Sequence, residues 1–141
     1  MRFWDTSALV PLVVVERQTP RVRRWMAEDD DVVVWTLARV ELLSALARRR
    51  REAGAAPAAL VAARRAILEV WERWSEVSAL DLVRRQAERI VESHPLRAAD
   101  ALQIGAALVA AGDDPESLTF VTLDANQAEA AGREGLLVLG P

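Results

Sequence analysis

Hydrophobic residues of this chain occur in short runs that stop at an acidic or hydroxyl side chain. Phe3-Trp4 is followed by Asp5, the run 32–35 by Thr36, and the run 119–123 by Asp124. Apolar runs of this length between polar residues are typical of strands buried on both faces of a parallel sheet. Longer stretches with helical periodicity separate them, so the pattern predicts an α/β domain.

Capping residues and helix breakers set the expected bounds of the helices. Thr19, Thr36 and Asp81 are expected N-caps, Gly54, Gly112 and Gly135 are expected stops, and residues 77–80 are compatible with either a strand or a turn. The predicted helices are Ala8–Val15, Thr19 to about Glu28, Thr36 to about Ala53, Pro57–Trp74, Asp81 to about Ser93, His94-Pro95-Leu96 to Ala111, and Ala125 to about Arg133, with a last strand at Leu136–Leu139.

Composition narrows the class of protein. With 141 residues, 52% of them hydrophobic, we expect one domain spanning 1–141 with a substantial core. The absence of cysteine argues against disulfides and cysteine-containing zinc sites. The apolar run 8–15 is too short to span a membrane and lacks a signal-peptide cleavage site, so we expect a soluble, cytoplasmic protein without a membrane partner.

Charge is distributed unevenly although the formal net charge is only −3. The basic residues are all arginines, and they cluster at 21–24, 48–51, 64–65 and 84–85. Such clusters are usually solvated helix faces. They can also hold phosphates in bidentate fashion, so the pattern permits an RNA partner without establishing one.

Acidic residues fall into two groups according to where they stand relative to the strands. Asp29-Asp30-Asp31 and Asp113-Asp114 precede strands, which favours solvated turns at the amino edge of a parallel sheet. Asp5 and Asp124 follow strands and therefore meet at the carboxyl edge, where open α/β sheets place their sites. Asp5 could also serve simply as a helix cap.

Two further acids lie on apolar helix faces. Glu41 shares its face with small and apolar residues in an early turn of its helix, close to the edge that carries Asp5. Asp100 is flanked by Leu96, Gln103 and Ile104. A buried carboxylate requires a cationic partner, and either Arg97 or a metal ion would serve.

Carboxylates gathered in one place repel each other, so a cation has to hold them together. Mg²⁺ or Mn²⁺ suits oxygen ligands better than zinc, because the chain has no cysteine and one histidine. That histidine, His94, precedes a proline and is interpreted as a turn residue. Mg²⁺ commonly works with substrate phosphates, which indicates phosphodiester chemistry.

The sequence resembles the PIN-domain ribonucleases, specifically the VapC-type toxins of toxin–antitoxin pairs. The motifs that carry the resemblance span nearly the whole chain: Asp5-Thr6-Ser7-Ala8-Leu9, the helix 36–46 with Glu41, His94-Pro95-Leu96-Arg97-Ala98-Ala99-Asp100-Ala101-Leu102, and Phe120-Val121-Thr122-Leu123-Asp124. The resemblance implies a three-layer α/β/α sandwich with a central, mainly parallel sheet. It also implies a Mg²⁺- or Mn²⁺-dependent endoribonuclease that forms a homodimer and is neutralised by a small cognate antitoxin.

The same resemblance places Asp5, Glu41, Asp100 and Asp124 on the acidic positions of the family. Our hypothesis for their roles is that Asp5 and Asp100 hold the metal ion, Asp124 completes its coordination, and Glu41 orients or deprotonates the attacking water. The hydroxyl groups of Thr6, Ser7 and Thr122 are expected to hydrogen-bond to these acids without binding the metal themselves. Many relatives carry a further acid just after the fourth, where this chain has Asn126.

Other functions fit parts of the pattern. A phosphotransfer enzyme with Asp5 as nucleophile usually has a second acid two residues later and a lysine, and this chain has Ser7 there and no lysine. A free-standing RNA-processing PIN nuclease and an inactive PIN-like module that binds RNA or protein are the nearer alternatives. Trp71 and Trp74 are expected to pack in the core, with an interface as the alternative.

Overall fold

The computed structural model describes residues 1–53 and 57–141. Its centre is a five-stranded sheet in the order β3-β2-β1-β4-β5. Every neighbouring pair of these strands runs parallel. The strands are β1 (Arg2–Trp4), β2 (Val32–Trp35), β3 (Ser75–Val77), β4 (Thr119–Val121) and β5 (Leu137–Leu139). All five carboxyl ends therefore lie along one edge of the sheet.

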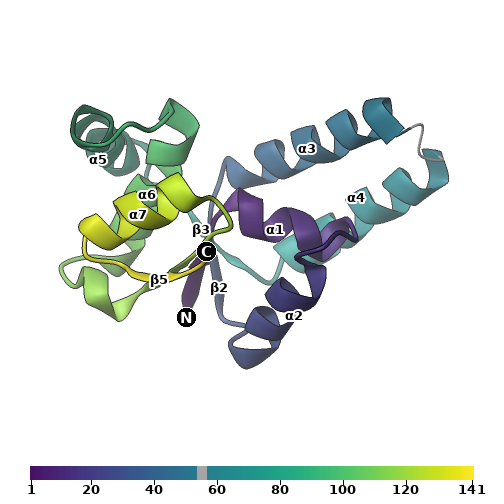
Figure 1. Cartoon of the computed structure of the whole chain (residues 1–141), viewed down its shortest axis with the longest axis horizontal. Helices are drawn as coiled ribbons and strands as arrows, with labels where there is room; N and C mark the ends of the chain where they lie inside the picture. The colour runs from purple at the N-terminus through teal and green to yellow at the C-terminus, as the bar shows by residue number, and fades with distance from the viewer. Residues whose placement is uncertain (54–56) are drawn as a thin grey trace.

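Helices cover both faces of the sheet, as Figure 1 shows, with α1 to α4 gathered on one side and α5 to α7 on the other. This arrangement follows from right-handed crossovers, because the chain moves outward from β1 in opposite directions in its two halves. The three-layer α/β/α sandwich predicted from the sequence is confirmed. The helices are α1 (Thr6–Val13), α2 (Thr19–Glu28), α3 (Ala38–Ala53), α4 (Pro57–Trp71), α5 (Leu80–Ser93), α6 (Ala98–Ala111) and α7 (Ala125–Arg133), with a short 3₁₀ turn at Pro115–Ser117.

The core lies on both sides of the central strands, which explains why these strands are continuous apolar runs. Phe3 and Trp4 of β1 have no exposed surface, and all four residues of β2 are buried. Phe3 stacks on Phe120 of the neighbouring β4, with ring centroids 5.6 Å apart. Burying an aromatic side chain of this size stabilises the fold by roughly 2–3 kcal/mol.

Three predicted N-caps do not cap their helices. Thr19 is the first residue of α2 and Gln18 is its cap, because the Thr19 hydroxyl instead donates to the Pro11 carbonyl (2.8 Å). The Thr36 hydroxyl bonds Glu76 on β3 (2.7 Å), and α3 begins only at Ala38. Asp81 stands inside the first turn of α5, where it pairs with Arg84 (3.1 Å).

Several element bounds also differ from the predicted ones. The strand expected at 119–123 ends at Val121, because the next residues turn to form the edge site. Of the ambiguous segment 77–80, only Val77 is in a strand: β3 spans Ser75–Val77, and α5 already begins at Leu80. The helix expected at Ala8–Val15 spans Thr6–Val13, and the one expected to reach Trp74 ends at Trp71. Gly54, the expected stop of α3, lies outside the described residues. Gly112 ends α6 with a positive φ of 65°, as predicted.

Trp71 and Trp74 pack on each other, with ring centroids 5.5 Å apart. Trp71 belongs to the core at 2% exposure, which confirms core packing for that residue, and Trp74 is half-buried beside it. His94 caps the C-terminus of α5 and bonds Glu134 (2.8 Å). In the part of the chain that the structure describes, no helix is long and apolar enough to cross a membrane.

Candidate active site

The carboxyl edge of the sheet has a topological switch point between β1 and β4. The helix after β1 packs on one face and the helix after β4 packs on the other, and this is where open α/β sheets form their crevices. Asp5 follows β1 directly and caps α1, while Asp124 caps α7 three residues after β4. The backbone N–H of Asp5 donates to the Val121 carbonyl (2.9 Å), which holds the two strand ends together.

Asp5 is buried at 2% exposure, and its hydrogen bonds converge on one carboxylate oxygen. Oδ2 accepts from the backbone N–H of Ser7 (3.1 Å), from the Ser7 hydroxyl and from the Thr122 hydroxyl (3.0 Å). Burial raises the pKa of Asp5 to about 6; the hydrogen bonds from Ser7 and Thr122 oppose this rise and the charge of Glu41 adds to it. Among the described residues none donates to Oδ1, which leaves that oxygen for a cation.

Thr122 connects Asp5 to Asp124. Its hydroxyl donates to Asp5 and accepts from the backbone N–H of Asp124 (3.0 Å). The Ser7 hydroxyl makes a parallel link, because it accepts from the backbone N–H of Leu123 (2.8 Å). These two hydroxyls fix the loop after β4 against the start of α1, and thereby the distance between the two acids.

Glu41 lies in the first turn of α3 and is bound from two other helices. Its Oε2 accepts from the hydroxyl of Thr6 on α1 (2.6 Å) and from the side-chain amide of Gln103 on α6 (2.8 Å). The same amide donates to the Thr6 hydroxyl (2.9 Å). The amide orientation follows from these contacts, because an ionised carboxylate only accepts hydrogen bonds.

Asp100 is half-buried in the first turn of α6 and lies near enough to Asp124 to be affected by its charge. Burial is the main cause that raises the pKa of Asp100, the charge of Asp124 raises it further, and the backbone N–H and guanidinium of Arg97 oppose the rise. Of the two cations considered for Asp100, Arg97 does not form the ion pair: it makes no salt bridge with any acid of the described residues. Its side chain is exposed to solvent.

Two glutamines that sequence analysis did not propose as site residues join the acids. Gln127 donates from its side chain to Asp100 Oδ1 (3.2 Å) and from its backbone to Asp124 Oδ1 (3.0 Å). Gln103 and Gln127 are buried at 1% and 4% exposure, and the side-chain oxygen of each has no hydrogen-bond partner in the described part of the chain. A sequence signal existed, because each glutamine stands three residues after a site acid, in Asp100-x-x-Gln103 and Asp124-x-x-Gln127.

These bonds form two branches that together reach all four predicted acids. One joins Glu41 through Thr6 and Gln103 to α6, and the other runs from Asp5 through Thr122, Asp124 and Gln127 to Asp100. The carboxylates are hard oxygen donors, the chemistry that Mg²⁺ and Mn²⁺ prefer. Within residues 1–53 and 57–141, no three acidic, histidine or cysteine side chains are already gathered as a chelate. The chemistry of these donors therefore suits a divalent ion, while their side chains are not gathered around a common point in this part of the chain.

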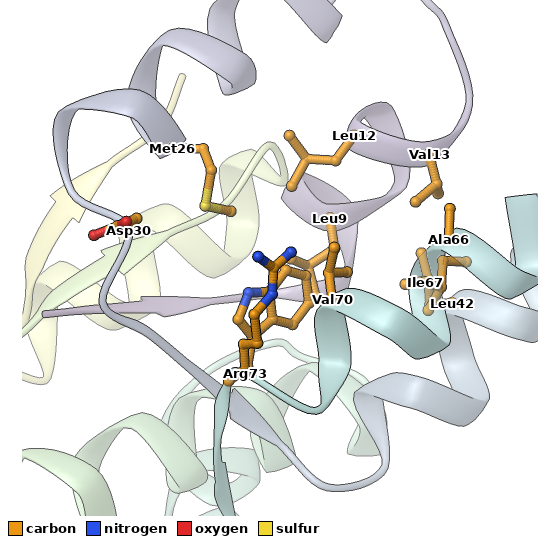
Figure 2. Close-up of a pocket in the computed structure, with 11 residues that line it drawn as sticks. Leu9, Leu12, Val13, Met26, Asp30, Leu42, Ala66, Ile67, Val70 and Arg73 are labelled. Carbon is orange, nitrogen blue, oxygen red and sulfur yellow. The ribbon is translucent and has the colours of Figure 1, made fainter.

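A separate apolar cavity of about 490 Å³ opens among the helices α1, α2, α3 and α4. Leu9, Leu12 and Met26 line it with Val70, and Figure 2 shows the Arg73 side chain directed into the space between them. None of the four site acids lines this cavity. It adjoins the helices of the site, since α1 and α3 contribute to its wall as well as to the acidic edge.

Solved structures share this fold. FitAcB from Neisseria gonorrhoeae superposes with a TM-score of 0.62 at 19% identity, covering 99% of this chain and 96% of that one. FitAB bound to an IR36 DNA fragment superposes with a TM-score of 0.68 at 19% identity, covering 100% of this chain and 95% of that one. PAE2754 from Pyrobaculum aerophilum superposes with a TM-score of 0.62 at 21% identity, covering 97% of this chain and 87% of that one.

No curated protein matches the chain. The family model of the PIN domain matches residues 2–133, which include β1 to β4 and α1 to α7 of the described structure. The chain belongs to the PIN-domain family.

Proposed function

We propose that this protein is a Mg²⁺- or Mn²⁺-dependent endoribonuclease, the toxin of a toxin–antitoxin pair. The observation that carries the proposal is the set of hydrogen bonds that ties Asp5, Glu41, Asp100 and Asp124 to one edge of the sheet. A buried carboxyl with a pKa near 6 is costly to keep ionised without a cation, which indicates a functional reason for its position. Membership of the PIN family supports nuclease chemistry.

Asp5, Asp100 and Asp124 would hold the divalent ion. When bound, the ion polarises the scissile phosphate and lowers the pKa of the attacking water. Asp5 offers Oδ1, because its other oxygen is occupied by Ser7 and Thr122. Burial raises the pKa of Asp5 and of Asp100, because it disfavours their ionised forms. A nearby cation would favour the ionised forms again, so both side chains suit a metal-binding role.

Glu41 would orient the attacking water and accept its proton. Thr6 and Gln103 hold Glu41 Oε2, and neither contact occupies Oε1, so this oxygen is free to bind the water. The hydrogen bonds from Thr6 and Gln103 fix the direction of the carboxylate, and a general base must point at the proton it removes. Hydrolysis by water in this way needs no covalent intermediate.

The partners follow from the same proposal: an RNA substrate in the cytoplasm, a cognate antitoxin and a second copy of the chain. The apolar cavity beside the site would accept an apolar segment of the antitoxin, with Arg73 and Asp30 available at its wall. Leu80 and Val91 are 58% and 42% exposed, and their spacing of about three turns places them on one face of α5, which suits a homodimer contact.

Cleavage of a pooled RNA with Mg²⁺, and with EDTA in its place, tests the proposal. We expect cleavage that EDTA abolishes and that Asp5→Asn and Asp100→Asn reduce to background while the proteins stay folded by circular dichroism. Asp81→Asn, an exposed acid paired with Arg84, is the matched control. Cleavage that survives in Asp5→Asn and Asp100→Asn would refute the assignment. Relief of growth arrest by the neighbouring gene would separate a toxin from a free-standing nuclease.

A further inference from the structure

Two exposed arginines flank the acidic edge from different helices. Arg97 immediately precedes α6 and lies one turn before Asp100. Arg48 lies on α3, the helix that carries Glu41. Both side chains are exposed, and within residues 1–53 and 57–141 neither forms a salt bridge or a side-chain hydrogen bond.

The position of Arg48 follows from helix geometry. It stands seven residues after Glu41, which is close to two full turns, so it lies on nearly the same side of α3 and roughly 10 Å along the axis. Ser44, one turn before Arg48 on this side, is exposed as well. In Figure 1, α3 runs outward from the sheet and α4 lies beside it, so residues later in α3 lie farther from the sheet than Glu41 does.

Some other arginines of the clusters form salt bridges, unlike Arg48 and Arg97. Arg49 pairs with Glu16 (2.5 Å), and Arg65 pairs with Glu69 on its own helix (2.9 Å). Their charges are neutralised locally. Arg48 and Arg97 instead form no salt bridge among the described residues, in a chain whose net charge is −3. Arg97 lies close enough to Asp100 for its charge to lower the pKa of that carboxyl, and Arg48 lies two turns along α3 from Glu41.

We propose that Arg48 and Arg97 bind backbone phosphates of the RNA strand on the two sides of the scissile bond. This inference rests on the proposed ribonuclease function. A guanidinium presents two parallel N–H donors to a phosphate, and an acidic site needs such contacts because its own carboxylates repel the strand. The contacts carry no base information, so they would bind RNA of any sequence and set its path across the acids.

Binding of a fluorescein-labelled single-stranded RNA of mixed sequence tests this directly, in EDTA so that no cleavage occurs. We expect Arg48→Ala and Arg97→Ala each to raise Kd about tenfold. Each should also reduce the slope of log K against log salt by about 0.7, the value for one phosphate contact on a single strand. Arg97→Lys should recover part of the affinity because it keeps the charge.

Arg23→Ala is the matched control, because Arg23 is an exposed arginine of α2 that forms no salt bridge among the described residues. It should leave Kd and the salt slope within about twofold of wild type. With Mg²⁺ present, the two site variants should raise KM and leave kcat nearly unchanged. Arg48 and Arg97 variants that bind RNA as Arg23→Ala does would overturn the inference, even if wild type cleaves RNA. Failure of the proposed function would show instead as absence of Mg²⁺-dependent cleavage by wild type.

Discussion

The Thr122 hydroxyl donates a 3.0 Å hydrogen bond to Asp5 Oδ2, joining residues 117 positions apart. The same hydroxyl oxygen accepts from the backbone N–H of Asp124, so one side chain sets the separation of two site acids. Thr122 is fully buried, which keeps water from competing for these bonds. The two ends of the chain are thereby joined at the carboxyl edge of the sheet.

Replacing Thr122 with valine keeps the shape and removes the hydroxyl. We expect the free energy of unfolding to fall by about 1–2 kcal/mol, because the part-buried N–H of Asp124 loses its acceptor and the buried Asp5 carboxylate loses a donor. Cleavage should fall as well, since Asp124 is no longer fixed relative to Asp5. Urea titration and initial rates measure the two effects. Thr119→Val on the preceding strand β4 is the control, and equal effects of the two substitutions would contradict the role of the Thr122 hydroxyl.

Asp5→Asn should change how stability depends on pH in the metal-free protein. The pKa of Asp5 is about 6 in the fold against an ordinary value of 3.8, so between these values the folded chain keeps a proton that the unfolded chain has lost. Stability should therefore decrease as pH rises through this window and stay lower above it. A pKa difference of this size corresponds to about 3 kcal/mol.

Asparagine does not ionise, so the stability of the Asp5→Asn variant should lack this decrease. Relative to wild type, the variant should therefore become more stable as the pH is raised from about 4 to about 7. Thermal unfolding in EDTA at both pH values measures the difference. Asp81→Asn should show no such gain, because Asp81 is exposed. If the unfolding temperatures of wild type and Asp5→Asn differ by the same amount at both pH values, burial does not penalise the Asp5 charge.

Gln103→Leu tests the amide that holds Glu41. Leucine fills a similar volume and removes a buried side-chain oxygen that has no partner among the described residues, so the free energy of unfolding should change by less than about 1 kcal/mol. Glu41 would lose one of its two donors and its fixed direction, so we expect kcat to fall at least about tenfold with KM little changed. A wild-type kcat in Gln103→Leu would show that Gln103 does not position Glu41 for the reaction.

Much of this architecture could be predicted from the sequence. The apolar runs before Asp5 and Asp124 indicated buried parallel strands, and parallel strands place their following residues on one edge. The PIN family and the α/β/α sandwich are confirmed. Single-residue assignments at helix starts were less successful, because Thr19, Thr36 and Asp81 found tertiary or neighbouring partners that outcompete capping.

The details of the site depended on tertiary contacts that a single sequence does not specify. Nothing in the local pattern shows that Gln103 reaches across from α6 to Glu41 on α3, or that Arg97 forms no ion pair with Asp100. The spacing Asp-x-x-Gln occurs at both acids, yet spacing alone cannot tell a buried amide from an exposed one. That the four acids serve one divalent ion stays a prediction from the sequence and the family.

Gly105 and Gly132 form a matched pair for the packing of the helices on one face of the sheet. A Cβ at Gly105 in α6 would lie 3.0 Å from the Val83 carbonyl oxygen and 3.2 Å from the Ala87 nitrogen, both backbone atoms of α5. Gly105→Ala should therefore destabilise the protein by about 1–3 kcal/mol. Gly132→Ala in α7 meets its nearest atom at 3.7 Å and should stabilise by about 0.5–1 kcal/mol. Urea unfolding of both variants checks the opposite signs.

Calorimetric titration of Mn²⁺ into the metal-free protein tests the shared metal site most directly. We predict saturable binding in wild type and in Asp81→Asn, with a loss of at least about tenfold in affinity in both Asp5→Asn and Asp100→Asn, because the ion needs ligands from both strand ends and from α6. Undiminished Mn²⁺ affinity in either of those two variants would contradict a shared site.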